Sequence, residues 1–585
     1  MRRLTLALAA TCLSIATPAL AGPTEDFKAL TDEIWAATLR EYPTFASTLG
    51  VHDQDDKLGD ISLAAEDRRA ADAQRYLDRL NAIPDAGLSP ADRVNKAILK
   101  RSLEESIEGN RFGQRMMLFT NRGGWHQYLA DLSENLVFRN ATDYENYLRR
   151  LGEYPAYNEE ALKISTRAMN EGYTLPCVAM TGFADTISGV IGNDPTKSRY
   201  YAPFAKDRPA NIDAATWSSL QSRARALIGG PLKAAYGRHL AWYTGQYAPK
   251  CNKSPSVAAQ PNGKAYYDYR IRTMTTTRMT ADQIHQLGLS EVKRIRAEME
   301  EVAKKAGFPS REAFIKDLRT NPKYYAKTPE ELMQAVARET KRIDGKMPTL
   351  FTLLPRLPYG IKEIPAEIAP GTTTAYYNSG SPENGIAGTY YVNTSKLDQR
   401  PLWEVPALTV HEAVPGHHHQ IALQQELPMP DWRKHGTFFT AFVEGWGLYS
   451  ERLGIEMGLY DTPAKDMGRL SYEMWRATRL VVDTGIHSKG WSKEQAVAFM
   501  TDNTALSAAN IDAEVNRYIS WPGQALAYKI GELKIRELRG RAEKELGDKF
   551  DLRRFHDAVL GQGAVPLDAL EAQINAWIVA EKTRA

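Results

Sequence analysis

Apolar residues recur at intervals of three and four along most of this chain, and this spacing constrains its fold more than any other feature. Residues 25–40 (EDFKALTDEIWAATLR) and 93–107 (RVNKAILKRSLEESI) show the pattern clearly, as expected for helices that bury one face. Residue pairs typical of capping boxes, which start helices, recur as well: Thr280 with Gln283, Thr328 with Glu331, and Ser492 with Gln495. The sequence therefore predicts a mainly α-helical protein.

The first 21 residues have the pattern of a secretory signal. Arg2 and Arg3 precede a short apolar run, and Ala19-Leu20-Ala21 fits the small-residue cleavage pattern. The run is shorter than the roughly 20 residues that span a bilayer, and no later segment is apolar for long enough. A lipoprotein signal at Cys12 is disfavoured by Thr11 before it. We expect cleavage near Ala21 and an exported mature chain, periplasmic or extracellular, without a membrane anchor.

The charge balance of the mature chain bears on which partners it can attract. The whole chain has 74 Lys and Arg against 71 Asp and Glu, a net charge of +3, and loss of Arg2 and Arg3 leaves +1. This balance gives no reason to expect nucleic acid or an acidic membrane surface. Two cysteines remain, Cys177 and Cys251, which in an oxidising compartment either form one bridge or stay as buried thiols. The oligomeric state is not indicated.

One break in composition divides the chain. Residues 250–264 are rich in Pro, Ser, Asn and Gly, as in a long surface loop or a junction between lobes. With 43% hydrophobic residues, the chain can bury a large core. We predict a signal peptide over 1–21, an N-terminal helical lobe over 22–260, and a second lobe over 261–585 that contains a histidine motif.

A second exception to the helical pattern runs over residues 372–396. Thr and Tyr cluster on both sides of a Ser-Pro-Glu-Asn-Gly turn, which predicts an antiparallel β-hairpin. The hairpin directly precedes the histidine motif, so we expect it beside the active-site helix. There it would add a peptide as an extra strand, with Tyr390, Tyr391 and Asn393 as candidate substrate-binding residues.

The segment HEAVPGHHHQ, which starts at His411, carries the main functional signal. His411 and Glu412 match the start of the zinc motif HExxH, but Pro415 stands where the second histidine belongs. In a straight helix His411 and His417 would be ~9 Å apart along the axis. A metal site therefore requires a break at Pro415-Gly416. The alternative is a helix cap followed by a solvated histidine-rich end, although the apolar flanks favour a buried cluster that needs a metal or partner charge.

A third ligand is expected on a following helix, and Glu444 in FVEGWGLYSE is the best candidate. On a helical wheel Glu444 lies opposite the aromatic face, which also fits an ordinary amphipathic helix with a solvated acidic face. Gly445 and Gly447 disfavour a helix by roughly 1 kcal/mol each relative to Ala. They suggest that another element approaches closely there, but the wheel does not decide between the two interpretations.

Taken together, six segments resemble a known family, the bacterial proteins grouped as domain of unknown function 885. The segments cover nearly the whole mature chain: YPTFASTLGVHDQDDKLGDIS (42–62), GTYYVNTSKL (388–397), HEAVPGHHHQ (411–420), EGWGLYSE (444–451), RLVVDTGIH (479–487) and EVNRYISWPGQALAYKIG (514–531). These proteins look like distant relatives of the helical gluzincin peptidases, the class that includes angiotensin-converting enzyme and the peptidyl-dipeptidases. The resemblance implies a large, helical, two-lobed metallopeptidase-like fold, and an exported zinc peptidase that hydrolyses short peptides.

The resemblance also implies residue roles. His411, His417 and Glu444 would bind one zinc ion, with His417 preferred over His418 because the family pattern has Pro-Gly-His. Glu412 would be the general base that takes a proton from the attacking water. The remaining roles fall to these residues: Glu451 orients a ligand histidine, Asp483 orients His487 from one helical turn away, and His487, Arg517, Tyr518 and Tyr528 stabilise the tetrahedral intermediate or hold a peptide carboxylate.

The sequence leaves alternatives open. Instead of binding substrate, Arg517 could pair with Glu514 or Asp512. Instead of a peptidase, the protein could be a zinc hydrolase of another amide, such as a cell-wall peptide or a small molecule, or an exported protein that binds metal or peptide without cleavage. Glu412 favours an enzyme, because a binding protein has no use for a base beside its first ligand.

Overall fold

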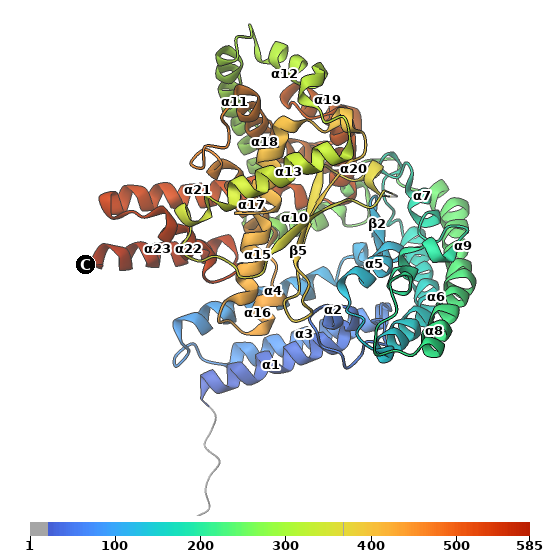
Figure 1. Ribbon diagram of the computed structural model, residues 1–585. Coiled ribbons are helices and arrows are strands. Elements are labelled where there is room, and N and C mark those ends of the chain that lie inside the picture. Colours follow the sequence, from blue (N-terminus) through green and yellow to red (C-terminus); the bar gives the residue numbers. More distant parts are fainter. Residues whose placement is uncertain (1–21, 367, 585) are drawn as a thin grey trace, which may run out of the picture.

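Helices dominate the architecture, as predicted (Figure 1). The computed structural model describes residues 22–366 and 368–584, so the predicted signal peptide over 1–21 lies outside the described residues. Helices α1–α9 run along the lower and right sides of Figure 1, and most of α10–α23 lie above and to the left, with α16 reaching down beside α1. Within the described residues, no helix combines the length and the apolar character needed to cross a bilayer.

The helices of the first half of the chain have these bounds: α1 Pro23–Glu41, α2 Pro43–Thr48, α3 Leu63–Ala82, α4 Pro90–Gly109, α5 Trp125–Leu132, α6 Ala141–Asn170, α7 Phe183–Ser188, α8 Ala214–Leu227 and α9 Lys233–Trp242. Those of the second half are α10 Gly263–Thr275, α11 Ala281–Lys305, α12 Arg311–Thr320, α13 Pro329–Asp344, α14 Val405–Glu412, α15 His417–Glu426, α16 Asp431–His435, α17 Thr440–Leu453, α18 Pro463–Lys489, α19 Lys493–Asn503, α20 Ala508–Ser520, α21 Ala527–Leu546, α22 Leu552–Leu560 and α23 Leu567–Thr583. The patterns at 25–40 and 93–107 fall in α1 and α4, which confirms both predicted helices.

Two of the three predicted capping boxes form as expected. Thr280 and Ser492 each exchange hydrogen bonds with the glutamine three residues later. Thr328 accepts from the backbone N–H of Glu331, but the Glu331 carboxylate accepts from Lys327 instead of Thr328.

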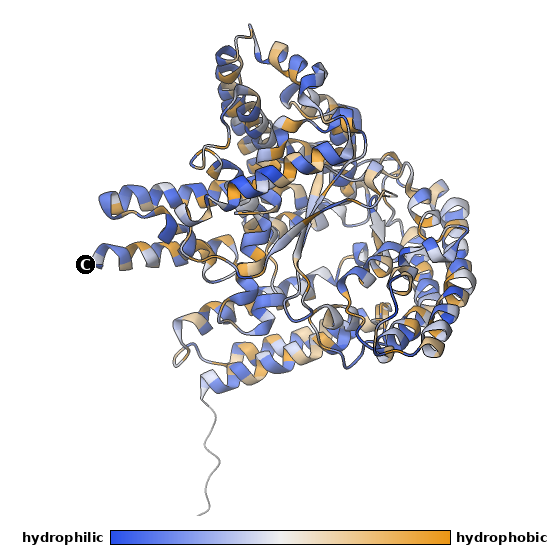
Figure 2. Cartoon of the chain, viewed as in Figure 1, coloured by the Kyte–Doolittle hydropathy of each residue, from blue (hydrophilic) through white to orange (hydrophobic). Residues whose placement is uncertain are grey.

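Figure 2 shows hydrophilic and hydrophobic residues along the helices of the protein. The hydrophobic faces of the helices form the cores.

The predicted hairpin is confirmed and belongs to a three-stranded sheet. Strands β4 (Ala375–Asn378) and β5 (Gly388–Val392) pair antiparallel, with Tyr377 opposite Tyr390. Strand β3 (Tyr359–Glu363), which was not predicted, pairs parallel with the other edge of β5. Because β5 is central, a peptide can extend this sheet only at the outer edge of β3 or β4. The remaining strands, β1 (Phe119–Thr120) and β2 (Gly123–Gly124), form a separate short pair.

The hydrophobic cores cut across the predicted lobes. One core lies within residues 119–247. A second core joins apolar residues of α1, α3 and α4 to those of α17 and α21–α23. The apolar cores therefore do not follow a single division at residue 260. Long helix α18 runs through the second half of the chain and is buried almost continuously from Met467 to His487.

The two cysteines form a disulfide bond. The Cys177 and Cys251 sulfur atoms lie 1.98 Å apart, and the bridge joins residues 74 positions apart in the chain. The backbone beside the bridge is also paired, because Cys177 N–H donates to the Asn252 carbonyl and Asn252 N–H donates to the Leu175 carbonyl. Of the two alternatives that the sequence left open, the structure has the bridge, which ties the 250–264 segment to residues 175–177.

Candidate metal centre

The histidine motif folds as two helices separated by a short break. Helix α14 ends at Glu412 and α15 begins at His417, so the break falls at Pro415-Gly416 as predicted. The His411 and His417 rings consequently meet with centroids 4.7 Å apart, about half the separation along a straight helix. Glycine is required at position 416, because a Cβ atom there would lie 1.9 Å from the His411 carbonyl oxygen.

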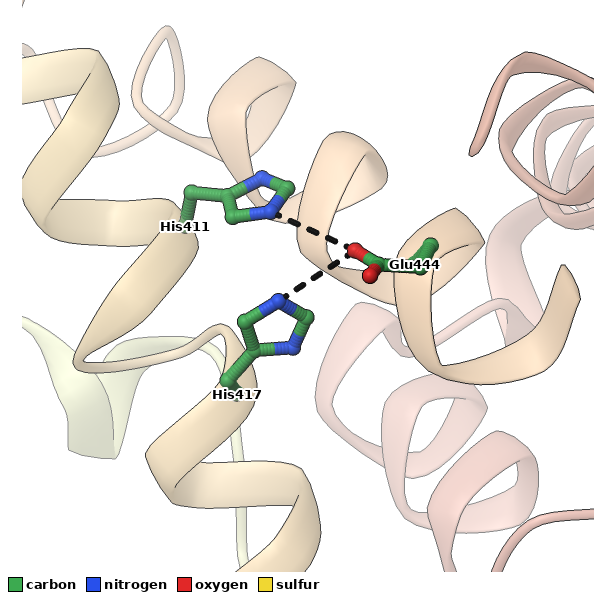
Figure 3. A group of neighbouring side chains, drawn as sticks. All are labelled: His411, His417 and Glu444. Carbon is green, nitrogen blue, oxygen red and sulfur yellow. Dashed lines mark ion pairs between the residues drawn. The ribbon is translucent and has the colours of Figure 1, made fainter. Parts of the chain in front are cut away.

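Glu444 of α17 completes a cluster with these two histidines (Figure 3). Its Oε2 lies 3.6 Å from His411 Nε2 and 3.3 Å from His417 Nε2. The three ligand atoms lie within 4.8 Å of one another, and no other group of this kind occurs among residues 22–366 and 368–584. Four ligands at the 2.0–2.1 Å bond lengths of tetrahedral zinc are separated by roughly 3.3 Å. The cluster therefore has the dimensions of a zinc site.

The chemistry of these atoms also fits zinc. Glu444 Oε2 is buried and, among the described residues, is paired with the two histidines alone. A buried carboxylate is costly unless a cation lies nearby. Imidazole nitrogen and carboxylate oxygen, without a thiolate, are a common donor set for catalytic zinc. The Glu444 side chain keeps 14% exposure, so the cluster is not sealed from solvent.

Electrostatics at the cluster favour positive charge. Burial opposes ionisation of His411, but hydrogen bonds with Glu444 and Glu451 raise its pKa to about 9. Burial likewise opposes ionisation of Glu444, yet the neighbouring His417 and His411 hold its pKa well below its usual range. The two carboxylates thus stabilise positive charge on His411 by more than burial destabilises it, as a cation site requires.

Glu451 and Arg476 contact His411 at Nδ1, the ring nitrogen that does not face Glu444. Glu451 Oε1 lies 2.8 Å from His411 Nδ1, and Arg476 Nη2 lies 2.9 Å from the same oxygen. This contact leaves His411 Nε2 facing Glu444, which is the geometry predicted for an orienting carboxylate. Glu444 and Glu451 are two turns apart on α17 and therefore share one face of that helix.

The two glycines of α17 make the close approaches that the sequence suggested. A Cβ atom on Gly447 would lie 2.8 Å from His411 Cε1, so only glycine lets the imidazole pack against this helix. A Cβ atom on Gly445 would lie 2.6 Å from the Gly531 backbone of α21. Backbone contact at Gly445 and Gly531 brings α21, with Tyr528 one turn before Gly531, next to the metal-binding helix.

The structure turns the other two histidines of the motif away from the cluster. His418 Nδ1 lies 3.0 Å from the Tyr377 hydroxyl, and its Nε2 lies 3.0 Å from the Leu357 carbonyl oxygen. His419 packs on Phe351 with ring centroids 4.4 Å apart, and burial lowers its pKa to about 3. His417, His418 and His419 are all buried, so the alternative of a solvated histidine-rich end is wrong.

Glu412 directly follows the ligand candidate His411 in the chain and has no partner of its own among the described residues. Its side chain is 8% exposed, and within the described part of the chain it has no hydrogen bond or ion pair. Tyr390 of β5 lies close by: burial raises the pKa of this tyrosine, and the nearby Glu412 charge raises it further. An unpaired carboxylate beside a ligand histidine is free to accept a proton.

The other two candidate substrate-binding residues have structural contacts instead. The Tyr391 hydroxyl donates to Glu134 Oε2 at 2.8 Å. The Asn393 side-chain amide donates to three backbone carbonyl groups within 3.0 Å: those of Ala369, Thr372 and Thr373. The Asn393 side chain is also fully buried. These contacts give Asn393 a structural role, because its donors fix the loop before β4, and its role in substrate binding stays a prediction.

Of the late residues, Tyr528 lies nearest the cluster. Its ring stacks on His411 with centroids 6.3 Å apart. Its hydroxyl accepts hydrogen bonds from Arg517 Nη1 at 3.4 Å and Gln524 Nε2 at 3.3 Å, which leaves its own proton free to donate. Arg517 also pairs with Glu514 at 2.8 Å, one of the partners considered from the sequence.

Tyr518 is a packing residue that fixes arginine positions. Its hydroxyl accepts from Trp475 Nε1 at 2.8 Å and from Arg479 Nε at 2.9 Å, and its side chain is 1% exposed. Direct contact of Tyr518 with a substrate is therefore not indicated.

His487 and Asp483 lie elsewhere on α18. His487 Nδ1 accepts from the Val257 backbone N–H at 3.1 Å, and its Nε2 lies 3.0 Å from the Tyr518 carbonyl oxygen. Asp483 accepts from the Tyr267 hydroxyl at 2.6 Å rather than orienting His487. His487 follows Arg476, the neighbour of His411, by eleven residues of one helix, or ~16 Å. The predicted Asp483–His487 contact is therefore wrong, and the position of His487 gives no support to its predicted oxyanion role.

Two arginines near these residues were not predicted from the sequence: Arg476 of α18, and Arg122 of the turn between β1 and β2. Burial and the positive charge of Arg517 lower the pKa of Arg122 to about 10, which places it near that residue. The available signal for Arg476 was its position in an apolar helix, EMWRATRL, where a buried arginine needs a partner. Nothing in the local sequence linked Arg122 to the site.

The fold and the site define a class of mainly helical proteins with a buried two-histidine, one-glutamate cluster. Residues 43–574 match the family model described as bacterial protein of unknown function (DUF885). The chain therefore belongs to this family. No curated protein sequence matched it.

Two solved structures are similar over almost the whole chain. One is a protein of Colwellia psychrerythraea, provisionally described as a lipoprotein, with 26% identity and a TM-score of 0.87 over 96% of this chain and all of that one. The other is a protein of Shewanella oneidensis, similarly described and of unknown function, with 20% identity and a TM-score of 0.70 over 95% of this chain and all of that one. The second likeness shows the fold alone.

Proposed function

We propose that this protein is an exported zinc peptidase that hydrolyses short peptides. The observation that carries the proposal is the His411–His417–Glu444 cluster, together with the unpaired carboxylate of Glu412, the residue after His411. The cluster has the donor set and spacing of a zinc site with three protein ligands, an arrangement typical of catalytic zinc. Export follows from the signal pattern at residues 1–21.

The chain's own residues would divide the work of amide hydrolysis. A zinc ion held by the cluster supplies Lewis acidity, which polarises a carbonyl group and lowers the pKa of water. Glu412 takes the proton of the attacking water and returns it to the leaving amine. Tyr528 donates its free hydroxyl proton to the oxygen that gains charge in the transition state. Glu451 and Arg476 keep His411 in one orientation throughout.

Two other functions compete with this proposal. A zinc hydrolase of another amide would use the same cluster, and only the substrate distinguishes it from a peptidase. A protein that binds metal or peptide without cleavage would not need Glu412. The unpaired state of that carboxylate favours an enzyme, because a carboxylate next to a ligand histidine and without a partner is free to accept a proton.

A peptide library tests the proposal. Purified protein is incubated with mixed short peptides, with and without a zinc chelator, and the products are identified by mass spectrometry. We expect cleavage that the chelator abolishes and added zinc restores. Absence of cleavage from every peptide by zinc-loaded protein would contradict the peptidase proposal, and cleavage that survives complete zinc removal would contradict the proposed centre.

A further inference from the structure

A cavity of about 370 Å³ lies beside the two helices that carry His417 and Glu444. It is bounded by α2, the turn between β4 and β5, α15 and α16. Gln420 and Gln424 of α15 line it, three and seven residues after His417, and Val443, the residue before Glu444, lines it as well. Side chains at these spacings share one face of a helix. This face of α15 therefore leads from His417 into the cavity within one turn, or ~5 Å.

Gln420 presents a hydrogen-bond acceptor without a partner. Gln424 Oε1 accepts from the Ala564 backbone N–H at 2.7 Å, and Gln420 Nε2 donates to the same oxygen at 3.4 Å. The end of the Gln420 amide that stays free is therefore Oε1, which is buried and has no hydrogen-bond partner among the described residues. Gln420 is only 2% exposed. A buried acceptor of this kind is costly unless a ligand supplies a donor.

Gln425 presents a second free acceptor in the same cavity. Its Nε2 donates to the Gly380 carbonyl oxygen at 3.1 Å, which leaves Oε1 buried and unpaired in the described part of the chain. Gln420 and Gln425 are five residues apart on α15, a rise of ~7.5 Å. A ligand with O–H or N–H donors at several points of its surface satisfies both acceptors better than a single amide group does.

The cavity has little charge of its own. Of the residues that line it in the described part of the chain, none has a carboxylate, and Lys434 alone has a permanent charge. Lys434 pairs with Asp431 at 3.8 Å, and burial lowers the pKa of His435, which favours the neutral ring. A charged ligand would therefore find no free counter-ion there, and an apolar ligand would leave the Gln420 and Gln425 acceptors unsatisfied. The cavity fits a neutral ligand with several donors.

Aromatic rings line this cavity and an adjoining one. Phe438 lines the first cavity and is 63% exposed. Phe45 of α2 lines both the first cavity and the second, which has a volume of about 430 Å³. The other aromatic residues of the second cavity are Tyr42, Trp125, Tyr128, Tyr154 and Tyr157. Sugars combine hydroxyl donors at the ring edge with an apolar C–H face that packs against aromatic rings, so these walls have the chemistry of a sugar site.

We propose that the cavity between α2 and α15 binds a neutral sugar and that the adjoining cavity holds the next sugar of the same chain. The substrate of the metal centre is then a short peptide that carries a sugar near the scissile bond. An extended peptide advances ~3.3–3.6 Å per residue, so about one residue spans the helical turn between His417 and Gln420. The substrate assignment rests on the proposed peptidase function, whereas sugar binding does not.

Sugar binding to the zinc-loaded protein tests the cavity without turnover. Two neutral disaccharides, N,N′-diacetylchitobiose and maltose, are titrated by isothermal titration calorimetry, and we expect at least one to bind with a Kd of about 1 mM or tighter. Gln420→Leu removes the free acceptor and keeps the size, and it should weaken binding about 3- to 10-fold. Phe438→Ala should weaken it by a similar factor, because the exposed ring is lost.

Val579→Ala is the matched control for Phe438→Ala, because Val579 of α23 is equally exposed at 63%. It should bind sugar as the wild type does. Failure of both sugars to bind the wild type overturns the inference, and so does wild-type affinity in both Gln420→Leu and Phe438→Ala. If Gln420→Leu does not fold by circular dichroism, the surface variant Phe438→Ala decides.

Zinc affinity separates sugar binding by Gln420 from a positioning role. His417 Nδ1 is also buried without a partner within residues 22–366 and 368–584, so the rival role for Gln420 is to orient this ligand. Zinc titration of Gln420→Leu should give wild-type affinity. A loss of zinc affinity with unchanged sugar affinity would overturn the inference.

A pair of peptides separates failure of the inference from failure of the proposed function. The two have the same sequence, and one carries on a central serine the sugar that binds best. With wild-type protein, the glycosylated peptide should have a KM about 3- to 10-fold lower. Equal kinetics for both peptides would overturn the substrate assignment and leave the peptidase proposal standing. Sugar binding without cleavage of either peptide would support the sugar site and contradict the peptidase proposal.

Discussion

His417 and His418 are adjacent in sequence, yet the structure gives them opposite surroundings. His417 Nε2 faces Glu444, whereas both ring nitrogens of His418 contact oxygen atoms of Tyr377 and Leu357. We predict that His417→Ala lowers zinc affinity by more than the ~10- to 100-fold typical of losing an orienting partner. His418→Ala should leave zinc affinity nearly unchanged. Zinc titration of the two folded variants decides, and an equal or larger loss in His418→Ala would contradict the ligand assignment.

Functional residues could be predicted from the sequence where they lie within a recognisable motif. His411, Glu412 and Glu444 could be proposed from HEAVPGHHHQ and EGWGLYSE, and the structure brings the two ligand candidates together beside Glu412. His487 could not be placed, because its surroundings depend on the Val257 loop and on the Tyr518 carbonyl group. Such contacts join segments far apart in the chain, which local spacing does not encode.

At the scale of helices, α17 and α21 meet backbone to backbone. A Cβ atom on Gly531 would lie 1.8 Å from the Ala441 carbonyl oxygen, whereas one on Gly540 of the same helix would meet nothing within 4 Å. We predict that Gly531→Ala destabilises the protein by about 1–3 kcal/mol through overpacking. Gly540→Ala should stabilise it by about 0.5–1 kcal/mol, because alanine favours a helix. Urea unfolding of both variants measures the difference, and destabilisation of similar size in both would contradict the packing account.

Only part of the three-stranded sheet could be predicted from the sequence. The hairpin of β4 and β5 was predictable because its strands flank one turn of Ser, Pro, Glu, Asn and Gly. Strand β3 was missed because it pairs parallel with β5 across an intervening segment that contains β4, and no turn joins the two strands. The break between α14 and α15 was predictable from Pro415 and Gly416, since proline and glycine both disfavour a continuous helix.

For the whole molecule, zinc binding should be linked to stability. The cluster joins α14, α15 and α17, so a ligand that binds only the folded state adds about 2.7 kcal/mol at 100 times its Kd. We predict that chelation lowers the Tm by a few degrees and that zinc restores it. His417→Ala should show a Tm that does not respond to chelator. An unchanged wild-type Tm after complete zinc removal would contradict the linkage.

The division of the whole molecule was the least predictable feature. Composition placed one boundary near residue 260, but α1, α3 and α4 share their core with helices at the far end of the chain. Amphipathic spacing shows that a helix buries a face and does not show which helix covers it. The same limit hid Arg122, whose neighbours Arg517 and Glu514 lie almost 400 positions further along the chain.

The central claim is that Glu412 acts as a base beside a zinc ion held by His411, His417 and Glu444, and turnover by Glu412→Gln tests it most directly. Zinc content and hydrolysis of a peptide that the wild type cleaves are measured on the same preparation. Glutamine keeps the shape and the three ligands but cannot accept the proton, so we predict full zinc content and turnover at least ~100-fold lower. Wild-type turnover by fully zinc-loaded Glu412→Gln would contradict the account.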